Sequence, residues 1–134
     1  MLVAAWLIAL SAFDIRHRRL PNTLTLPGAL AVLAGAALFG RGGPALAGAA
    51  VLTAVYLLVC LTGGLGAGDV KLAIGLGGLT GAFGADAWTL AAVGAPILTG
   101  LVALTALAWG RRDPVPHGPS MCVASAAAVA LAWV

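Results

Sequence analysis

Charged residues and clusters of proline and glycine divide this chain of 134 residues into six strongly apolar segments. A helix that crosses a membrane needs about 20 mostly apolar residues, so we interpret each segment as a spanning helix. At about 1.5 Å per residue, Met1 to Phe13 covers about 20 Å, and we expect the first helix to continue past Asp14 or to begin upstream of Met1. The predicted helices cover Met1 to about Arg16, Asn22 to Phe39, Pro44 to Leu61, Asp69 to Thr80, Ala85 to Gly110 and about Pro119 to Val134.

The composition indicates that these helices lie in lipid rather than in water. Hydrophobic residues make up 62% of the chain and charged residues 8%, and the mean hydropathy is +1.09. Because a soluble domain carries about 25% charged residues, this chain lacks the polar surface that a soluble enzyme of its size requires. We therefore predict an all-α fold, a polytopic transmembrane helix bundle of about six spans, as a single integral-membrane domain over residues 1–134.

The basic residues indicate how this bundle is oriented. When the loops are assigned alternately to the two sides, six of the seven basic residues fall on one side and Arg41 falls on the other. Because positive charge marks the cytoplasmic side, we predict that both termini lie outside. The net charge of +3 is interpreted as this topology signal and not as a surface for nucleic acid. The six residues on the predicted cytoplasmic side are Arg16, Arg18, Arg19, Lys71, Arg111 and Arg112.

Every side-chain carboxylate of the protein belongs to one of four aspartates, because the sequence contains no glutamate. This excludes metalloproteases of the HExxH type and any acid–base pair that uses glutamate. Asp113 belongs to a basic loop, and Asp86 stands where an N-cap of the fifth helix would explain it. We interpret both of these as structural.

Asp14 and Asp69 differ, because each lies at the predicted cytoplasmic end of an apolar segment. A charge inside a span costs about 2.5 to 3.5 kcal/mol, so it usually has a function or a partner. A structural role stays open for each: Asp14 as the partner of a nearby arginine, Asp69 as the N-cap of the fourth helix. As a close pair, the two carboxylates would share one proton, so that one activates a water and the other polarises a carbonyl. That is the chemistry of aspartic proteases, and it needs no metal or cofactor.

Three motifs occur in an order that is typical of one family of membrane proteases. Residues 66–71 read GAGDVK, which matches GxGDxK, and Asp14 is followed by LPN at residues 20–22. Residues 116–119 read PHGP, with His117 in the place of a phenylalanine. Over essentially the whole chain this pattern resembles the type IV prepilin peptidase family, which are intramembrane aspartic proteases of the GxGD class. We expect His117 itself to pack or to cap the last helix.

The resemblance implies that the chain cleaves the basic leader from pilin-like precursors, ahead of their hydrophobic helix. Cleavage would take place at the cytoplasmic face of the bacterial inner membrane, without a metal or another cofactor. Asp14 and Asp69 match the two catalytic aspartates of the family. The motif residues that match in support are Gly66, Gly68, Lys71 and Asn22. Because Lys71 does not share a helix face with Asp69, we expect it to support the site and not to catalyse.

Longer members of that family carry paired CxxC motifs and methylate the new pilin N-terminus. Cys60 and Cys122 form no CxxC pair. The chain is therefore similar to the short, peptidase-only form, and we expect no methyltransferase activity.

The main alternative is an ion- or proton-coupled transporter subunit, which would also hold paired carboxylates within the membrane. Such a subunit is expected to place them near the midplane, on broken helices of a repeat. Here they lie near one interface, and no repeat is apparent. A serine protease is disfavoured because the chain has no GxSxG motif and because His117 and Ser120 are too close along the chain to belong to a triad.

Overall fold

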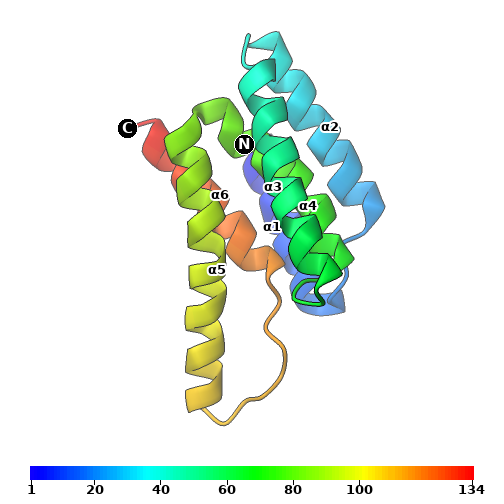
Figure 1. Cartoon of the computed structure of the whole chain (residues 1–134), viewed down its shortest axis with the longest axis vertical. Helices are drawn as coiled ribbons and strands as arrows, with labels where there is room; N and C mark the ends of the chain where they lie inside the picture. Colours follow the sequence, from blue (N-terminus) through cyan, green and yellow to red (C-terminus); the bar gives the residue numbers. More distant parts are fainter.

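The computed structural model describes all 134 residues, which form six α-helices running alternately up and down a bundle (Figure 1). All six predicted segments are confirmed as helices. The fourth is longer than predicted, because Gly66, in extended backbone, starts it before Asp69, and Gly84, at φ 116°, ends it. A positive φ is tolerated best by glycine. The helices are α1 (Leu2–His17), α2 (Asn22–Leu38), α3 (Gly42–Leu61), α4 (Ala67–Phe83), α5 (Ala85–Ala108) and α6 (Gly118–Ala132).

Two of these helices, α3 and α5, are long and apolar enough to cross a membrane, and α2 and α6 are shorter apolar helices. Large apolar side chains stay exposed on the outer faces, among them Leu46 and Leu58 of α3 and Leu101 and Leu104 of α5. Extensive exposed apolar surface marks a face that meets lipid or another protein. The fold is consistent with a helical membrane protein, and the number of spans and their orientation stay predictions.

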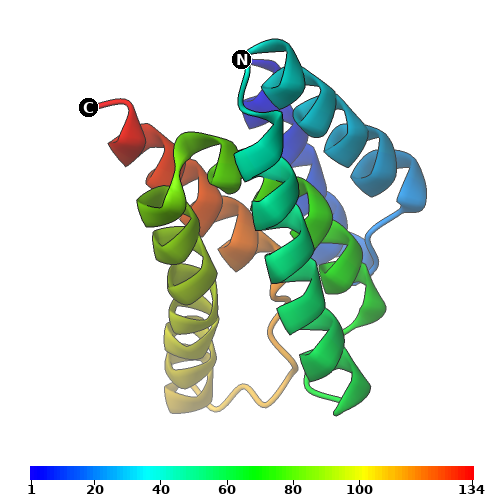
Figure 2. The ribbon, with the colours of Figure 1, turned by 45° about the horizontal axis from the view of Figure 1, so that its top comes forward.

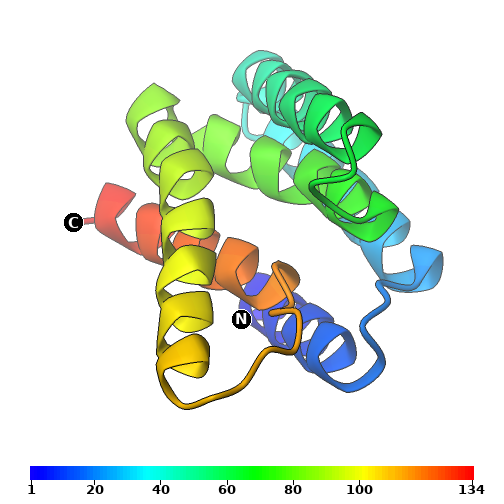
Figure 3. The same ribbon diagram turned by 60° about the horizontal axis from the view of Figure 1, so that its bottom comes forward.

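The central element of the bundle is α4, which packs against α2, α3, α5 and α6. Figure 2 shows α2 and α3 beside α4, and Figure 3 shows α1 beside α6. Leu72, Ala73 and Leu76 of α4 are completely buried. Because Asp69 lies in the first turn of this core helix, its position is set by contacts along the whole length of α4.

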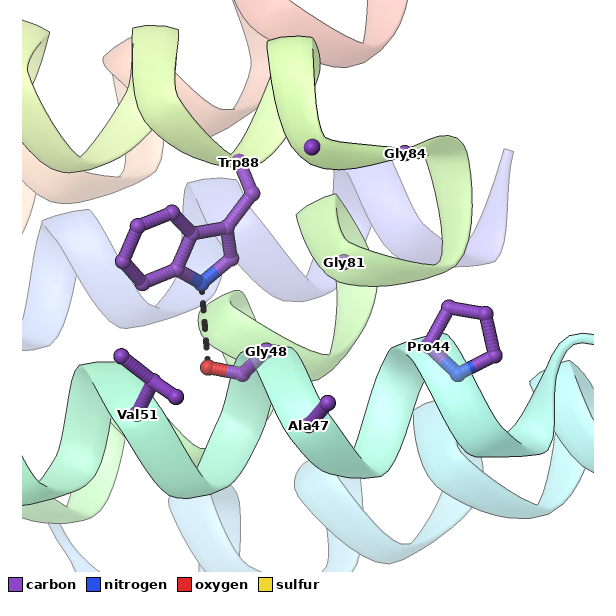
Figure 4. A pocket seen from close by; sticks show the side chains of 8 residues that line it. Pro44, Ala47, Gly48, Val51, Gly81, Gly84 and Trp88 are labelled. Atoms are coloured by element: carbon purple, nitrogen blue, oxygen red, sulfur yellow. Dashed lines mark hydrogen bonds between the residues drawn. The ribbon is translucent and has the colours of Figure 1, made fainter.

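Glycines bring α3 and α4 into backbone contact. A Cβ atom added to Gly77 would lie 2.6 Å from the carbonyl oxygen of Gly48, and one added to Gly81 would lie 2.7 Å from that of Pro44. Small residues at such a contact let membrane helices approach closely. Trp88 of α5 completes the junction, since its Nε1 donates a hydrogen bond of 3.0 Å to the Gly48 carbonyl (Figure 4).

A pocket of about 410 Å³ lies beside this junction, lined by Trp88 and by residues of α3, α4 and the turn into α5 (Figure 4). It lies at the opposite end of α4 from Asp69, roughly 18 Å away by the rise from Asp69 to Gly81. None of its lining residues is acidic, basic or a histidine. The pocket is therefore separate from the aspartates.

The connecting segments gather at the two ends of the bundle. Residues 18–21, 62–66 and 109–117 lie toward the lower end in Figure 1, and the turns at residues 39–41 and at Gly84 lie at the upper end. The first group contains Arg18, Arg19, Arg111 and Arg112. The loops therefore alternate as the sequence predicts, and the C-terminal end of α1 and the N-terminal end of α4 belong to the same, basic end.

Candidate active site

Asp14 lies near the C-terminal end of α1, and only 7% of its surface is exposed. Its Oδ2 accepts a hydrogen bond of 3.0 Å from the backbone amide of Gly118, the first residue of α6. That amide is one of the N–H groups that a helix N-terminus leaves without an intrahelical partner. Arg16 and Arg18, by contrast, are exposed. The buried carboxylate thus contacts the start of α6.

Asp69 is the third residue of α4, and its side chain is partly exposed. The prediction that Asp69 is the N-cap is wrong, because the helix starts two residues earlier and its N-cap is Gly66. The Asp69 carboxylate instead interacts with the backbone amide of Gly66. A side chain at this position that reaches back to the N-cap amide is half of a capping box.

The structure brings Asp14 and Asp69 together at the basic end of the bundle. The two carboxylates lie close enough that the charge of Asp14 acts on Asp69. Gly68, the residue before Asp69, packs against the segment that follows α1. A Cβ atom added to Gly68 would lie 3.4 Å from Cβ of Leu20 in that segment. Residues 55 positions apart in the sequence thus lie at one end of the bundle, where the charge of one acts on the other.

The other two aspartates lie apart from this pair. Asp86 is exposed in the first turn of α5, at the opposite end of the bundle, and the N-cap of that helix is Gly84, so the prediction of a cap at Asp86 is wrong. Its carboxylate lies instead at the positive end of the helix dipole. Asp113 is exposed in the loop between α5 and α6. Neither residue contributes to the candidate site.

Lys71 and Asn22, both predicted as supporting residues, are in direct contact. Nζ of Lys71, on α4, donates a hydrogen bond of 2.6 Å to Oδ1 of Asn22, the first residue of α2. The bond is exposed and joins two helices at the end that holds the aspartates. The structure places Lys71 toward α2, and its supporting role stays a prediction.

Two further side chains, Tyr56 and Thr99, meet His117 directly before α6. The phenol oxygen of Tyr56, on α3, lies 2.8 Å from Nε2 of His117, and Oγ1 of Thr99, on α5, lies 2.6 Å from Nδ1. The charge of Asp69 acts on the Tyr56 phenol, so this cluster adjoins the candidate site. The sequence analysis missed Tyr56 and Thr99, because they are isolated polar residues in apolar helices. The only sequence signal for this cluster was His117, which stands in the PHGP motif where a phenylalanine was expected.

The hydrogen-bond partners of His117 suit a ring that carries its proton on Nδ1. In that tautomer the Thr99 hydroxyl donates to the carbonyl of Ala95, at 3.1 Å, and its oxygen accepts from Nδ1–H of His117. Nε2 then accepts the hydroxyl proton of Tyr56. Burial lowers the pKa of His117, which lies in the loop outside the helices, below its ordinary value of 6.5. Both observations favour a neutral imidazole with both nitrogens bonded.

The arrangement provides two carboxylates at one end of the bundle, beside an irregular glycine-containing segment, and the Asp14 carboxylate accepts a hydrogen bond from a backbone amide. Residues 62–66 between α3 and α4 are non-helical, and Gly63 has a φ of 83°. No group of three His, Cys, Asp or Glu side chains is placed to hold a metal ion. The groups at this end of the bundle that can exchange protons include the two carboxylates.

Comparisons with known proteins agree with the motifs. A family model described as the type IV leader peptidase family matches residues 1–110, a range that ends before PHGP. A prepilin leader peptidase/N-methyltransferase of Xanthomonas campestris pv. campestris is 35% identical over 133 residues, covering 92% of this chain and 46% of that protein. The chain thus spans about half the length of this curated relative. No solved structure matches the chain.

Proposed function

From the membership of this chain in the type IV leader peptidase family, we propose that it is an aspartic endopeptidase that removes the leader from pilin-like precursors. The observation that carries the proposal is the coupled pair of Asp14 and Asp69 at one end of the bundle. Family membership supports a leader peptidase, and the two carboxylates at one end of the bundle support an aspartic mechanism. The proposed substrate is a precursor with a short basic leader followed by a hydrophobic helix.

The proposed reaction uses one proton shared between the two carboxylates. The ionised carboxylate takes a proton from a water molecule as the water oxygen attacks the scissile carbonyl carbon. The protonated carboxylate donates a hydrogen bond to the carbonyl oxygen, where negative charge develops. When the tetrahedral intermediate collapses, the C–N bond breaks and the amine leaves with a proton from the carboxyl groups. The pair then returns to its singly protonated state.

We further propose that the bundle crosses the bacterial inner membrane six times, with both termini outside and the active site facing the cytoplasm. The clustering of basic loops at the end that holds Asp14 and Asp69 supports this orientation. The hydrophobic helix of the precursor would lie in the bilayer beside the bundle. Its leader would then extend into the cytoplasm, with the scissile bond at the depth of the aspartates.

The transporter alternative is less well supported, because the aspartates lie at helix ends. Asp14 is three residues from the end of α1, and Asp69 is in the first turn of α4. Paired carboxylates of a transporter are expected near the bilayer midplane. If the transporter alternative were correct, replacing either aspartate would abolish ion flux in proteoliposomes, and the unaltered protein would not cleave a prepilin.

The test is co-expression with a prepilin, using four isosteric variants of the four aspartates. We expect Asp14→Asn and Asp69→Asn to abolish leader cleavage, measured by the mass of the prepilin product. Asp86→Asn and Asp113→Asn are the matched controls, and we expect both to cleave normally. Immunoblots of the membrane fraction establish that every variant is present at the same level. Normal processing by Asp14→Asn or by Asp69→Asn would overturn the aspartic mechanism.

A further inference from the structure

His117 and Gly118 are consecutive residues that contact two different parts of the candidate site. The Gly118 amide donates a hydrogen bond to Oδ2 of Asp14. The His117 ring is hydrogen-bonded to Tyr56, and the charge of Asp69 acts on the Tyr56 phenol. Two consecutive residues therefore link Asp14 to the tyrosine on which Asp69 acts. A shift of this segment would move the amide that donates to Asp14 and the ring that bonds to Tyr56 together.

The contact between Gly118 and Asp14 leaves no spare room. A Cβ atom added to Gly118 would overlap Oδ2 of Asp14 and would lie 3.0 Å from its Cγ. Gly118 is buried, and its amide bond to Asp14 is buried as well. The carboxylate thus rests directly on the backbone at the start of α6, so its position depends on how that start is held.

The His117 ring holds the start of α6 against two other helices. It is bonded on one side to Tyr56 of α3 and on the other side to Thr99 of α5. Three helices are therefore tied at a single imidazole, next to a loop that returns from the far end of α5 (Figure 3). A phenylalanine in this place would fill a similar volume but would make neither hydrogen bond.

We propose that His117 is a positioning residue that fixes the Gly118 amide on Asp14 and the Tyr56 phenol beside Asp69, and so sets the relative placement of the two carboxylates. The inference rests on the proposed function for its kinetic consequence only. Its structural consequence, the fixation of the Gly118 amide, follows whether or not the chain is a peptidase. A role in packing alone would require volume at this position but no hydrogen bonds.

The first test is the kinetics of prepilin cleavage by His117→Phe, His117→Gln and Tyr56→Phe. We expect His117→Phe and Tyr56→Phe to lower kcat by about 10- to 100-fold, with a smaller change in KM, because small displacements of catalytic groups have effects of this size. His117→Gln keeps a side-chain oxygen that can accept from Tyr56, and we expect it to retain more activity than His117→Phe. The matched control is His17→Phe, the same substitution at the exposed histidine.

The second test is hydrogen exchange of the Gly118 amide in detergent-solubilised protein, followed by NMR or by mass spectrometry of peptides covering residues 112–121. We expect slow exchange in the unaltered protein and in His17→Phe, and exchange at least about 10-fold faster in His117→Phe, because the opening free energy of a local contact governs its exchange. This measurement needs no substrate. It keeps the inference testable if the chain does not cleave a prepilin, in which case only the proposed function fails.

The outcomes separate positioning from packing. If His117→Phe cleaves with the kcat of the unaltered protein and the exchange of Gly118 is unchanged, the inference is overturned. If kcat falls only because the protein unfolds, all three variants, His117→Phe, His117→Gln and Tyr56→Phe, will lose helix content in circular dichroism and will be less abundant in the membrane. That result also overturns the inference. Retained helix content, a fall in kcat and faster Gly118 exchange in His117→Phe support it.

Discussion

The backbone amide of Gly118 donates a hydrogen bond of 3.0 Å to Oδ2 of Asp14, which joins residues 104 positions apart in the sequence. The contact places a buried carboxylate at the N-terminal end of α6, where unpaired N–H groups and the helix dipole favour negative charge. Taken alone, it accounts for the burial of an aspartate in an apolar bundle. Together with the electrostatic coupling of Asp14 to Asp69, it holds one member of a candidate dyad in place.

We predict that Gly118→Ala lowers kcat/KM for prepilin cleavage by about 100-fold, because the new methyl group displaces the Asp14 carboxylate. The measurement is single-turnover cleavage with purified protein and prepilin. Gly100→Ala is the control, since a Cβ atom at Gly100 of α5 meets no atom within 4 Å. Cleavage by Gly118→Ala at the rate of the control would show that the contact is not needed.

The stability of the protein should depend on pH through His117. Its pKa is lowered in the folded protein by burial, so the unfolded chain binds a proton more readily. The neutral ring therefore contributes its full stability above pH 6.5, and this contribution is lost as the pH falls from 6.5 through the lowered pKa. The slope from this one group reaches at most about 1.4 kcal/mol per pH unit.

The check is the free energy of unfolding in detergent as a function of pH, for the unaltered protein and for His117→Gln. The titratable group in contact with the ring is Tyr56, and it is present in both proteins. The difference between the two curves therefore isolates His117. Parallel curves below pH 6.5 would contradict the prediction.

Much of the fold could be predicted, because every interruption of the apolar sequence contains charge, proline or glycine. Unsatisfied backbone and charged side chains are costly in a bilayer, so such residues separate the helices. The predicted start at Asn22 and the predicted end at Leu61 both match the structure. That Asp14 and Asp69 lie at the same end of the bundle could be predicted as well, since alternating helices place both there, but the distance between them could not. Their catalytic role stays a prediction.

The surroundings of the aspartates could not be predicted, because they depend on contacts between distant residues. Tyr56 and Thr99 lie 61 and 18 positions from His117, and neither stands in a motif. His117 was expected to pack or to cap, and it does stand at the N-cap of α6, but its ring makes no cap hydrogen bond and bonds to α3 and α5 instead. The prediction that Asp69 caps α4 was wrong because the backbone at Gly66 is extended, so that the helix starts directly after Gly66.

We predict a measurable coupling between Asn22 and Lys71, whose side chains are hydrogen-bonded at 2.6 Å. Because the bond is exposed, we expect a coupling energy of about 0.5 to 1 kcal/mol in the free energy of unfolding. A double-mutant cycle with Asn22→Ala and Lys71→Ala measures it. The control cycle pairs Asn22→Ala with Arg41→Ala, at the opposite end of α2, and should be additive. Additivity in both cycles would mean that the bond contributes nothing.

The contact between α3 and α4 should be the part of the bundle most sensitive to small increases in side-chain volume. In Gly77→Ala the new methyl group would lie 2.6 Å from the Gly48 carbonyl oxygen, and a backbone atom cannot move away alone. We expect a loss of about 1 to 3 kcal/mol in the free energy of unfolding in detergent. In Gly35→Ala, on α2, the methyl group meets no atom within 4 Å, and we expect a gain of up to about 1 kcal/mol.

Adding Gly81→Ala to Gly77→Ala separates a rigid contact from an adaptable one. The Gly81 methyl group would approach the Pro44 carbonyl, on the same helix as Gly48, so both substitutions push α3 and α4 apart. Once the helices have separated for the first methyl group, the second meets less resistance, and the combined loss should be smaller than the sum of the two single losses. If the two losses in free energy of unfolding are fully additive, the backbone adjusts separately around each new methyl group, and α3 and α4 do not move apart as rigid bodies.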